Sequence, residues 1–186
     1  AHEIAHILSY NTQTNNCWPV YEVTHSKVEE QFCDRFARSL LLPKTLFDFS
    51  EFNLSSFNQS QATKIKILWP EFQVSPWQIV KRLFDDYTEE NLVGILWEFF
   101  PHEDCFKIIE HHNPKNIFIP KHDRAFIETI FKKKKTNYAP EKAYKNEFYE
   151  GIDIIEIGSI YKKHLYTTAF SLRTSHASYV IQLIKI

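Results

Sequence analysis

Two histidines and a glutamate at the start of the sequence could hold and use a metal ion. His2 and His6 flank the motif HEIAH, in which Glu3 follows the first histidine. Side chains four residues apart lie on the same face of a helix, so both imidazoles can bind one metal ion. Glu3 would then lie beside the water that the metal activates, where a carboxylate can act as a base. The motif predicts a catalytic zinc site, and two surface histidines on an amphipathic helix are the alternative.

A zinc site of this type needs a third protein ligand and keeps a fourth position for water. The segment SKVEEQFCDRFARSLLLP, residues 26–43, offers Glu30 and Asp34, which are again four residues apart. Glu30 can supply the ligand, and Asp34 can accept a hydrogen bond from the second ring nitrogen of a zinc-bound histidine. A solvated helix face is the alternative for these two carboxylates. The two segments together favour zinc.

Two helices must position these side chains. Residues 1–9 show the pattern of a helix end, and residues 10–25 that of a loop with a short strand at 20–24. In the second segment, Ser26 and Glu29 form a capping box, and Pro43 ends the helix. One helical stripe runs along this second helix and consists of Val28, Phe32, Phe36, Ser39 and Leu40.

The rest of the chain divides into helical and extended patterns. Helices are predicted over residues 59–72, 75–87, 88–100 and 123–135. Segments rich in β-branched and aromatic residues, which predict an antiparallel meander, lie at 152–161, 164–173 and 178–186. The expected fold class is α+β, with the zinc-site helices first, then a helical subdomain at 59–100, and finally a C-terminal antiparallel β region.

The net charge of −1 hides an uneven distribution of charge. Residues 1–112 hold 9 Lys and Arg against 16 Asp and Glu, a net of −7, and residues 113–186 hold 13 against 7, a net of +6. Opposite signs in two parts of one chain suggest two functional units, or two faces that pack together. We therefore expect a metallopeptidase unit over 1–112 and a basic α/β unit with a regulatory or binding role over 113–186.

The composition excludes several classes of protein. Only 3 Gly are present, which tells against a β-sandwich or barrel with many tight turns. No apolar run approaches the roughly 18 residues of a membrane span, so no membrane partner is expected. Three cysteines without metal-finger spacing indicate free thiols in a reducing compartment, and hence a cytoplasmic protein. The chain has no Met and starts inside the HEIAH helix, so we expect a piece of a longer protein.

The two motifs resemble the ImmA/IrrE family of zinc metallopeptidases. HEIAH followed by ExxCDRFARSLLLP is similar to that family's H-E-x-x-H and E-x-x-A-[ND]-x-F-A-x-x-L-L-M-P. The resemblance assigns zinc ligands to His2, His6 and Glu30, the catalytic glutamate to Glu3, and the Asn/Asp position to Asp34. It covers residues 1–43 well and 59–84 loosely, with Cys33 and Leu42 at positions where the family pattern has Ala and Met.

The resemblance implies a single-zinc endopeptidase with a gluzincin-type fold. Such a protein would cleave a specific protein substrate, such as a DNA-bound transcriptional repressor, and so switch on a stress, mobile-element or defence response. In this fold the part before Ala1 would hold the start of the first helix and a sheet that pairs with the substrate, so this fragment is expected to be weakened or inactive by itself. Candidates for the group that stabilises the oxyanion are Tyr21, His25, His111 and His112.

Nucleic-acid binding is the competing interpretation. Residues 59–87 have the helix-turn-helix pattern, with Gln78, Lys81 and Arg82 on the second helix, although Trp77, Val80 and Phe84 there also suit simple packing. In the basic C-terminal part, single strands could contact Lys132, Lys133, Lys134, Lys135 and Tyr138. A solvated lysine-rich helix end is the alternative for that run. A third class is a sensor module formed by the C-terminal meander.

Cys105 lies in HEDC, close before His111 and His112. Its thiolate could fill the fourth zinc position and silence the enzyme. We favour the alternative that Cys105 is a small buried hydrophobe, because free cysteines are among the most buried residues.

Overall fold

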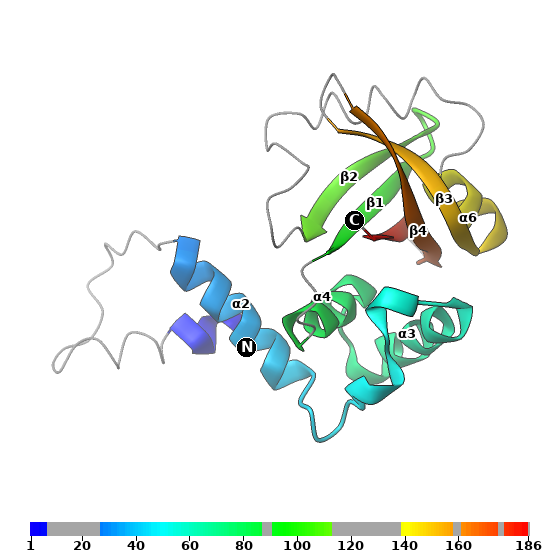
Figure 1. Cartoon of the computed structure of the whole chain (residues 1–186). Coiled ribbons are helices and arrows are strands. Elements are labelled where there is room, and N and C mark those ends of the chain that lie inside the picture. Colours follow the sequence, from blue (N-terminus) through cyan, green and yellow to red (C-terminus); the bar gives the residue numbers. More distant parts are fainter. Residues whose placement is uncertain (7–26, 87–90, 113–138, 158–160, 175–176, 186) are drawn as a thin grey trace, which may run out of the picture.

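The computed structural model describes residues 1–6, 27–86, 91–112, 139–157, 161–174 and 177–185. Residues 2–6 form an N-terminal helical turn. The further helices are α2 (Lys27–Leu41), α3 (Gln59–Phe72), α4 (Pro76–Asp86) and α6 (Ala139–Asn146), with 3-10 turns at Phe49–Glu51 and Leu54–Ser56. The strands are β1 (Leu92–Phe100), β2 (Cys105–His112), β3 (Phe148–Ile157), β4 (Tyr161–Arg173) and β5 (Ser178–Lys185) (Figure 1).

The five strands form one antiparallel sheet in the order β2-β1-β5-β4-β3. The α+β class is therefore confirmed. The predicted C-terminal meander is present as β3, β4 and β5, although β3 begins at Phe148 rather than at residue 152. Helix α2 ends at Leu41, before Pro43, and α3 spans the predicted 59–72. The predicted strand at 20–24, the helix at 123–135 and the cap at Ser26 lie outside the described residues.

The helix predicted over residues 88–100 is wrong, because Leu92–Phe100 is strand β1. Both of its faces are buried: Val93, Ile95 and Trp97 lie in an apolar cluster that includes residues of α6, and Leu92 and Leu96 lie in one that includes residues of α3 and α4. A strand buried on both faces shows no alternation of polar and apolar residues, so its apolar run can be mistaken for a helix.

The expected division at residue 112 runs through this sheet. β1 and β2 lie before the expected division, yet β1 pairs from Leu92 to Phe99 with β5, near the C-terminal end of the chain. The helical subdomain accordingly consists of α3, α4 and the 3-10 turns, and ends at Asp86.

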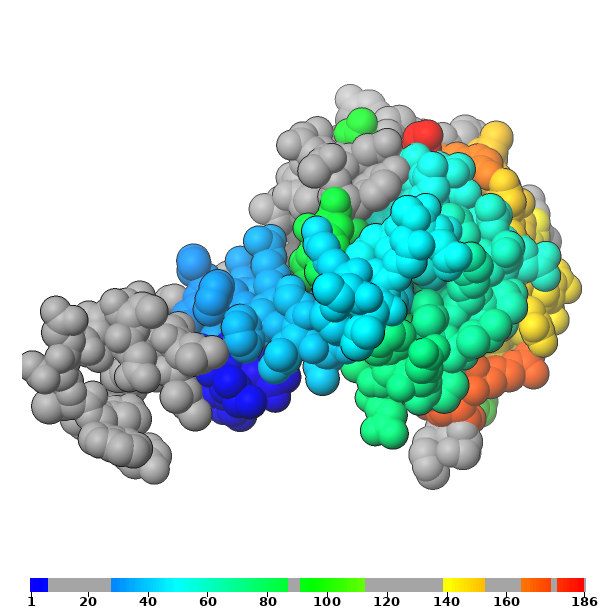
Figure 2. Space-filling view, turned by 90° about the horizontal axis from the view of Figure 1, so that it is seen from below, coloured from blue at the N-terminus to red at the C-terminus, as the bar shows by residue number. Residues whose placement is uncertain are grey.

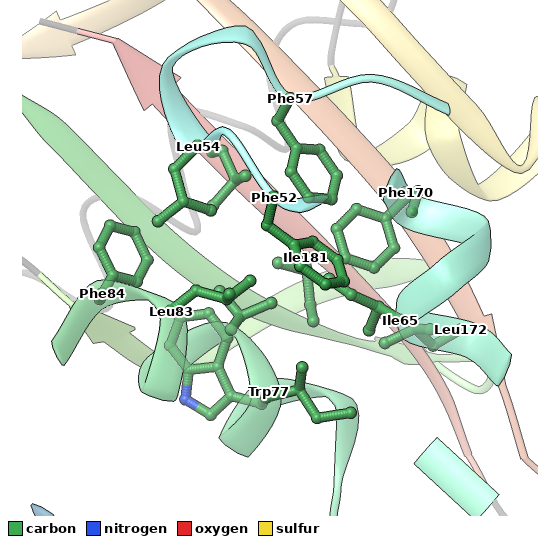
Figure 3. Packing of buried hydrophobic residues seen from close by; sticks show 14 of the residues in the cluster. Phe52, Leu54, Phe57, Ile65, Trp77, Leu83, Phe84, Phe170, Leu172 and Ile181 are labelled. Carbon is green, nitrogen blue, oxygen red and sulfur yellow. The ribbon is translucent and has the colours of Figure 1, made fainter. Parts of the chain in front are cut away.

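Each face of the sheet carries its own apolar core. On one face, Ile65 of α3 and Trp77 and Leu83 of α4 pack against Phe170 and Ile181 of the sheet (Figure 3). On the other face, Ala139 and Ala143 of α6 pack with Val180 and Ile184. Neighbouring residues of β5 thus point to opposite faces, as expected for a strand.

Helix α2 contacts the rest of the molecule through α4. Arg38 donates two hydrogen bonds to the Asp85 carboxylate, at 2.8 and 3.2 Å, and the Leu42 carbonyl accepts one from Arg82. The stripe of α2 that predicted the helix is not its buried face, since Val28 and Leu40 are 76% and 53% exposed. The buried positions of α2 are Cys33 and Arg38, which face the N-terminal helical turn and α4.

Gly94 allows α4 to approach the sheet, and we expect Gly94→Ala to destabilise the protein. A Cβ at Gly94 would lie 2.7 Å from Cε2 of Phe84 and 3.2 Å from Cη2 of Trp77, two buried rings of α4. Overpacking of this kind costs about 1–3 kcal/mol, more than the roughly 0.5–1 kcal/mol that Ala gains over Gly in a strand. The measurement is the free energy of unfolding in urea.

The matched control for this substitution is Gly151→Ala in β3. There the nearest atom to the added Cβ would be the Tyr149 hydroxyl, at the end of a side chain that can move. A Gly94→Ala protein that is no less stable than the Gly151→Ala protein would contradict the close approach of α4.

His112 should make the stability depend on pH in the acid range. Its ring stacks on Phe84, and burial lowers the pKa of His112 from 6.5 to about 4, with a partial opposing effect of Asp85. Between these two pKa values the unfolded chain binds a proton that the folded chain does not. The free energy of unfolding is therefore highest above about pH 6.5 and falls as the pH drops towards 4. The loss from this group is at most about 3 kcal/mol.

Urea unfolding between pH 7 and pH 4 measures this effect. His112→Gln should flatten the pH dependence, whereas His102→Gln, which changes an exposed histidine, should leave it in place. An equal slope in the wild type and in His112→Gln would rule out His112 as the source.

Candidate metal centre

The N-terminal helical turn places its two histidines side by side. The Ala5 amide donates to the Ala1 carbonyl at 3.2 Å, which is the i to i−4 bond of an α-helix. The rings of His2 and His6 have centroids 4.8 Å apart, and their Nε2 atoms are separated by 3.0 Å. The spacing in HEIAH therefore produces the shared face that the sequence predicted.

Glu30 of α2 completes a group of three. Its Oε2 lies 3.3 Å from Nε2 of His2, and its Oε1 lies 3.4 Å from Nε2 of His6. With metal–ligand bonds of roughly 2.0–2.1 Å, the corners of a tetrahedron around zinc lie about 3.3 Å apart. Among the described residues, these three side chains are the ones whose ligand atoms converge closely enough to hold a metal ion.

Carboxylates of α2 also contact the opposite nitrogen of each ring. Nδ1 of His2 lies 3.1 Å from Oδ1 of Asp34, and Nδ1 of His6 lies 3.3 Å from Oε1 of Glu29. A carboxylate accepts a hydrogen bond, so each contact favours the tautomer with its proton on Nδ1. That tautomer leaves a lone pair on each Nε2, directed at the other Nε2 and at Glu30. Three converging lone pairs repel one another unless a cation or a proton lies between them.

The surroundings of the group are acidic. Burial raises the pKa of the Cys33 thiol, and the nearby charges of Glu29, Glu30, Asp34 and Glu3 raise it further. A neutral thiol beside His6, at 3.4 Å from Nδ1, adds no charge to the site. The negative potential of the carboxylates favours a cation over an anion at this position.

The group is accessible from solvent. The side chain of His2 is 33% exposed, and Glu3 is exposed on the same helical turn. The turn and α2 lie together at one side of the described structure, and α2 packs against α4 (Figure 2).

Of the four candidates for the oxyanion group, the two that the structure describes are not at this centre. Tyr21 and His25 lie outside the described residues. His111 and His112 are on β2, where they pair with Ile95 and Gly94 of β1, and the His112 ring stacks on Phe84 at a centroid distance of 4.4 Å. We have assigned no oxyanion-stabilising residue among the described part of the chain.

The basic side chains of α4 are engaged within the molecule. Lys81 forms an ion pair with Glu110, to which Trp77 Nε1 also donates a hydrogen bond at 2.7 Å. Arg82 is only 5% exposed and pairs with Asp86 at 2.8 Å. Trp77, Val80 and Phe84 are buried, as the packing interpretation of this helix predicts. The geometry therefore gives no support to α4 as a DNA-reading helix.

The other predicted residues divide into two sets. Lys132, Lys133, Lys134, Lys135 and Tyr138 lie outside the described residues, so their proposed contact with nucleic acid stays a prediction. Cys105 is buried at the start of β2, with Glu103 Oε2 at 3.7 Å from its Sγ, which confirms the packing interpretation.

Glu29 is the contact that sequence reasoning missed. The sequence assigned it to the cap of α2, whereas in the structure its carboxylate contacts His6. Its place directly before Glu30 was the available signal, because the two positions lie about 100° apart on a helix and can face two different side chains.

Comparisons with known proteins leave the class of this protein open. The chain matches no family model in a scan of protein families, and a search of the curated proteins returns no match. In the described part of the chain, the helices are all too short or too polar to cross a membrane.

Proposed function

We propose that this chain carries the zinc centre of a metallo-endopeptidase of ImmA/IrrE type, with a gluzincin-type pair of ligand helices. The observation that supports the proposal is the convergence of His2 Nε2, His6 Nε2 and the Glu30 carboxylate at separations of 3.0 to 3.4 Å. A pair of surface histidines would not need a carboxylate against each Nδ1 as well. The donor set of two imidazoles and one carboxylate suits catalytic zinc.

In this proposal His2, His6 and Glu30 hold the metal ion. A bound zinc ion would supply Lewis-acid chemistry, in which the scissile carbonyl would be polarised and the pKa of a water molecule lowered towards neutrality. Glu3 accepts the proton of that water and delivers it to the departing amine. Asp34 keeps the ring of His2 oriented through its Nδ1 atom.

The proposed substrate is a specific protein, such as a transcriptional repressor bound to DNA. This part of the proposal depends on the sequence resemblance over residues 1–43 and 59–84. Cleavage of the repressor would switch on a stress, mobile-element or defence response in the cytoplasm. The alternative is a nucleic-acid-binding or sensor module without peptidase activity, for which the support is the basic C-terminal sequence.

The test begins with zinc binding. We expect the purified chain, and the chain extended by any residues encoded before Ala1, to bind one zinc ion each in equilibrium dialysis against a zinc buffer. Elemental analysis gives the stoichiometry. Failure of both proteins to bind zinc at micromolar free metal would contradict the proposal. A zinc stoichiometry that is unchanged when His2 and His6 are both replaced would contradict the assignment of the ligands.

A further inference from the structure

Helix α2 contacts the two histidines with two different rows of side chains. Glu30 and Asp34 form one row, and both contact His2, at 3.3 Å from Nε2 and 3.1 Å from Nδ1. Glu29 and Cys33 form the adjacent row, and both contact Nδ1 of His6, at 3.3 and 3.4 Å. Residues four apart share a helix face, so the two rows follow directly from the helical repeat.

We propose that Glu29 is the positioning residue for His6, as Asp34 is for His2. The inference rests on the proposed zinc centre and goes further, because it gives each ligand ring a carboxylate of its own. The Glu29 side chain is 21% exposed and that of His6 is 14% exposed, so both groups are largely shielded from competing water. A hydrogen bond from a ring N–H to a carboxylate is among the stronger ones, and it holds the ring in one orientation.

Glu29 and Cys33 have opposite consequences for the metal. If Nδ1 of His6 donates to Glu29, the proton is on Nδ1 and the Nε2 lone pair is directed at the centre. If the Cys33 thiol donates to Nδ1 instead, the ring proton lies on Nε2, where it blocks metal binding. The charged acceptor should win, because hydrogen bonds to ionised groups are about twice as strong as neutral ones and a thiol is a weak donor.

Zinc affinity of the full chain tests the role of Glu29. We expect Glu29→Ala to weaken zinc binding by the roughly 10- to 100-fold that loss of such a partner causes, and Asp34→Ala to do the same. Glu29→Gln should recover most of the affinity, because its amide oxygen can still accept from Nδ1. Glu71→Ala, at an exposed glutamate of α3, is the matched control and should bind as the wild type does.

The tautomer of His6 provides a readout that does not depend on zinc. Two-bond proton–nitrogen spectra of the zinc-free chain with ¹⁵N-labelled histidine should show His6 with its proton on Nδ1 in the wild type and in Glu29→Gln. In Glu29→Ala the ring should shift towards the tautomer protonated on Nε2. If Glu29 only stabilised the fold, its loss would not change the tautomer of His6.

Two results would overturn the inference. One is a zinc-free wild type in which His6 carries its proton on Nε2, and the other is a Glu29→Ala protein with the affinity of Glu71→Ala. If Glu29→Ala fails to fold, the wild-type spectrum still decides. These results are distinct from failure of the proposed function, which would appear as a wild-type chain that binds no zinc.

Discussion

Replacing Glu30 with glutamine is expected to remove most of the zinc from the protein. The substitution keeps the size of the side chain, but it replaces an anionic ligand with a neutral amide at 3.3 and 3.4 Å from the two Nε2 atoms. Loss of a direct ligand should exceed the 10- to 100-fold loss of affinity typical of a residue that only orients a ligand. Competition with a zinc chelator of known affinity measures the effect.

Glu71→Gln is the control for this experiment, since it makes the same chemical change at an exposed position of α3. We expect Glu71→Gln to bind zinc as the wild type does. Full zinc occupancy in Glu30→Gln would show that Glu30 is not a ligand and that α2 presents a solvated carboxylate.

The second large effect is expected from Glu3→Gln, which should keep the zinc and lose proteolysis. Glu3 is exposed on the N-terminal helical turn and is not one of the three converging ligands. In the proposed mechanism it moves a proton from the attacking water to the departing amine, a role worth roughly 10²- to 10⁴-fold in rate. The two Glu→Gln variants should therefore separate metal binding from catalysis.

Proteolysis can be measured without knowledge of the substrate. A peptide library made from a whole-cell proteome is incubated with the zinc-loaded chain extended by any residues encoded before Ala1, because the chain by itself is expected to be weakened or inactive. New amino termini are then identified by mass spectrometry. We expect new termini with the wild type and almost none with Glu3→Gln. Equal cleavage by both proteins would contradict the role of Glu3. No cleavage by the extended wild-type protein would contradict the proposed peptidase activity.

The candidate site shows what a sequence can predict about geometry within one helix. His2 and His6, and likewise Glu30 and Asp34, are four residues apart, so each pair had to share a face once its helix formed. The angle at which two helices meet is set by tertiary packing, which the spacing does not encode. Glu29 was missed for this reason, because its contact with His6 exists only in the observed placement of α2.

The errors in the fold have related causes. The apolar pattern correctly predicted that α2 is a helix, but Val28 and Leu40 are exposed and the buried side holds Cys33 and Arg38. An ion pair with Asp85 lets an arginine occupy a buried position that hydrophobicity alone would assign to an apolar residue. Strand β1 was misread as a helix because each of its faces lies in an apolar cluster with helix residues, so the sequence lacks the two-residue alternation of polar and apolar side chains.

The pairing of β1 with β5 has a consequence for how the chain folds. Trp97 of β1 donates its indole hydrogen bond to Gln182 of β5, across 85 residues of sequence. During synthesis the β1 edge of the β1–β2 hairpin therefore stays unpaired until β5 has been made. Contacts of such long range slow folding, and an open edge can pair with another chain. We infer that the nascent hairpin is the point at which this molecule is most vulnerable to misassembly.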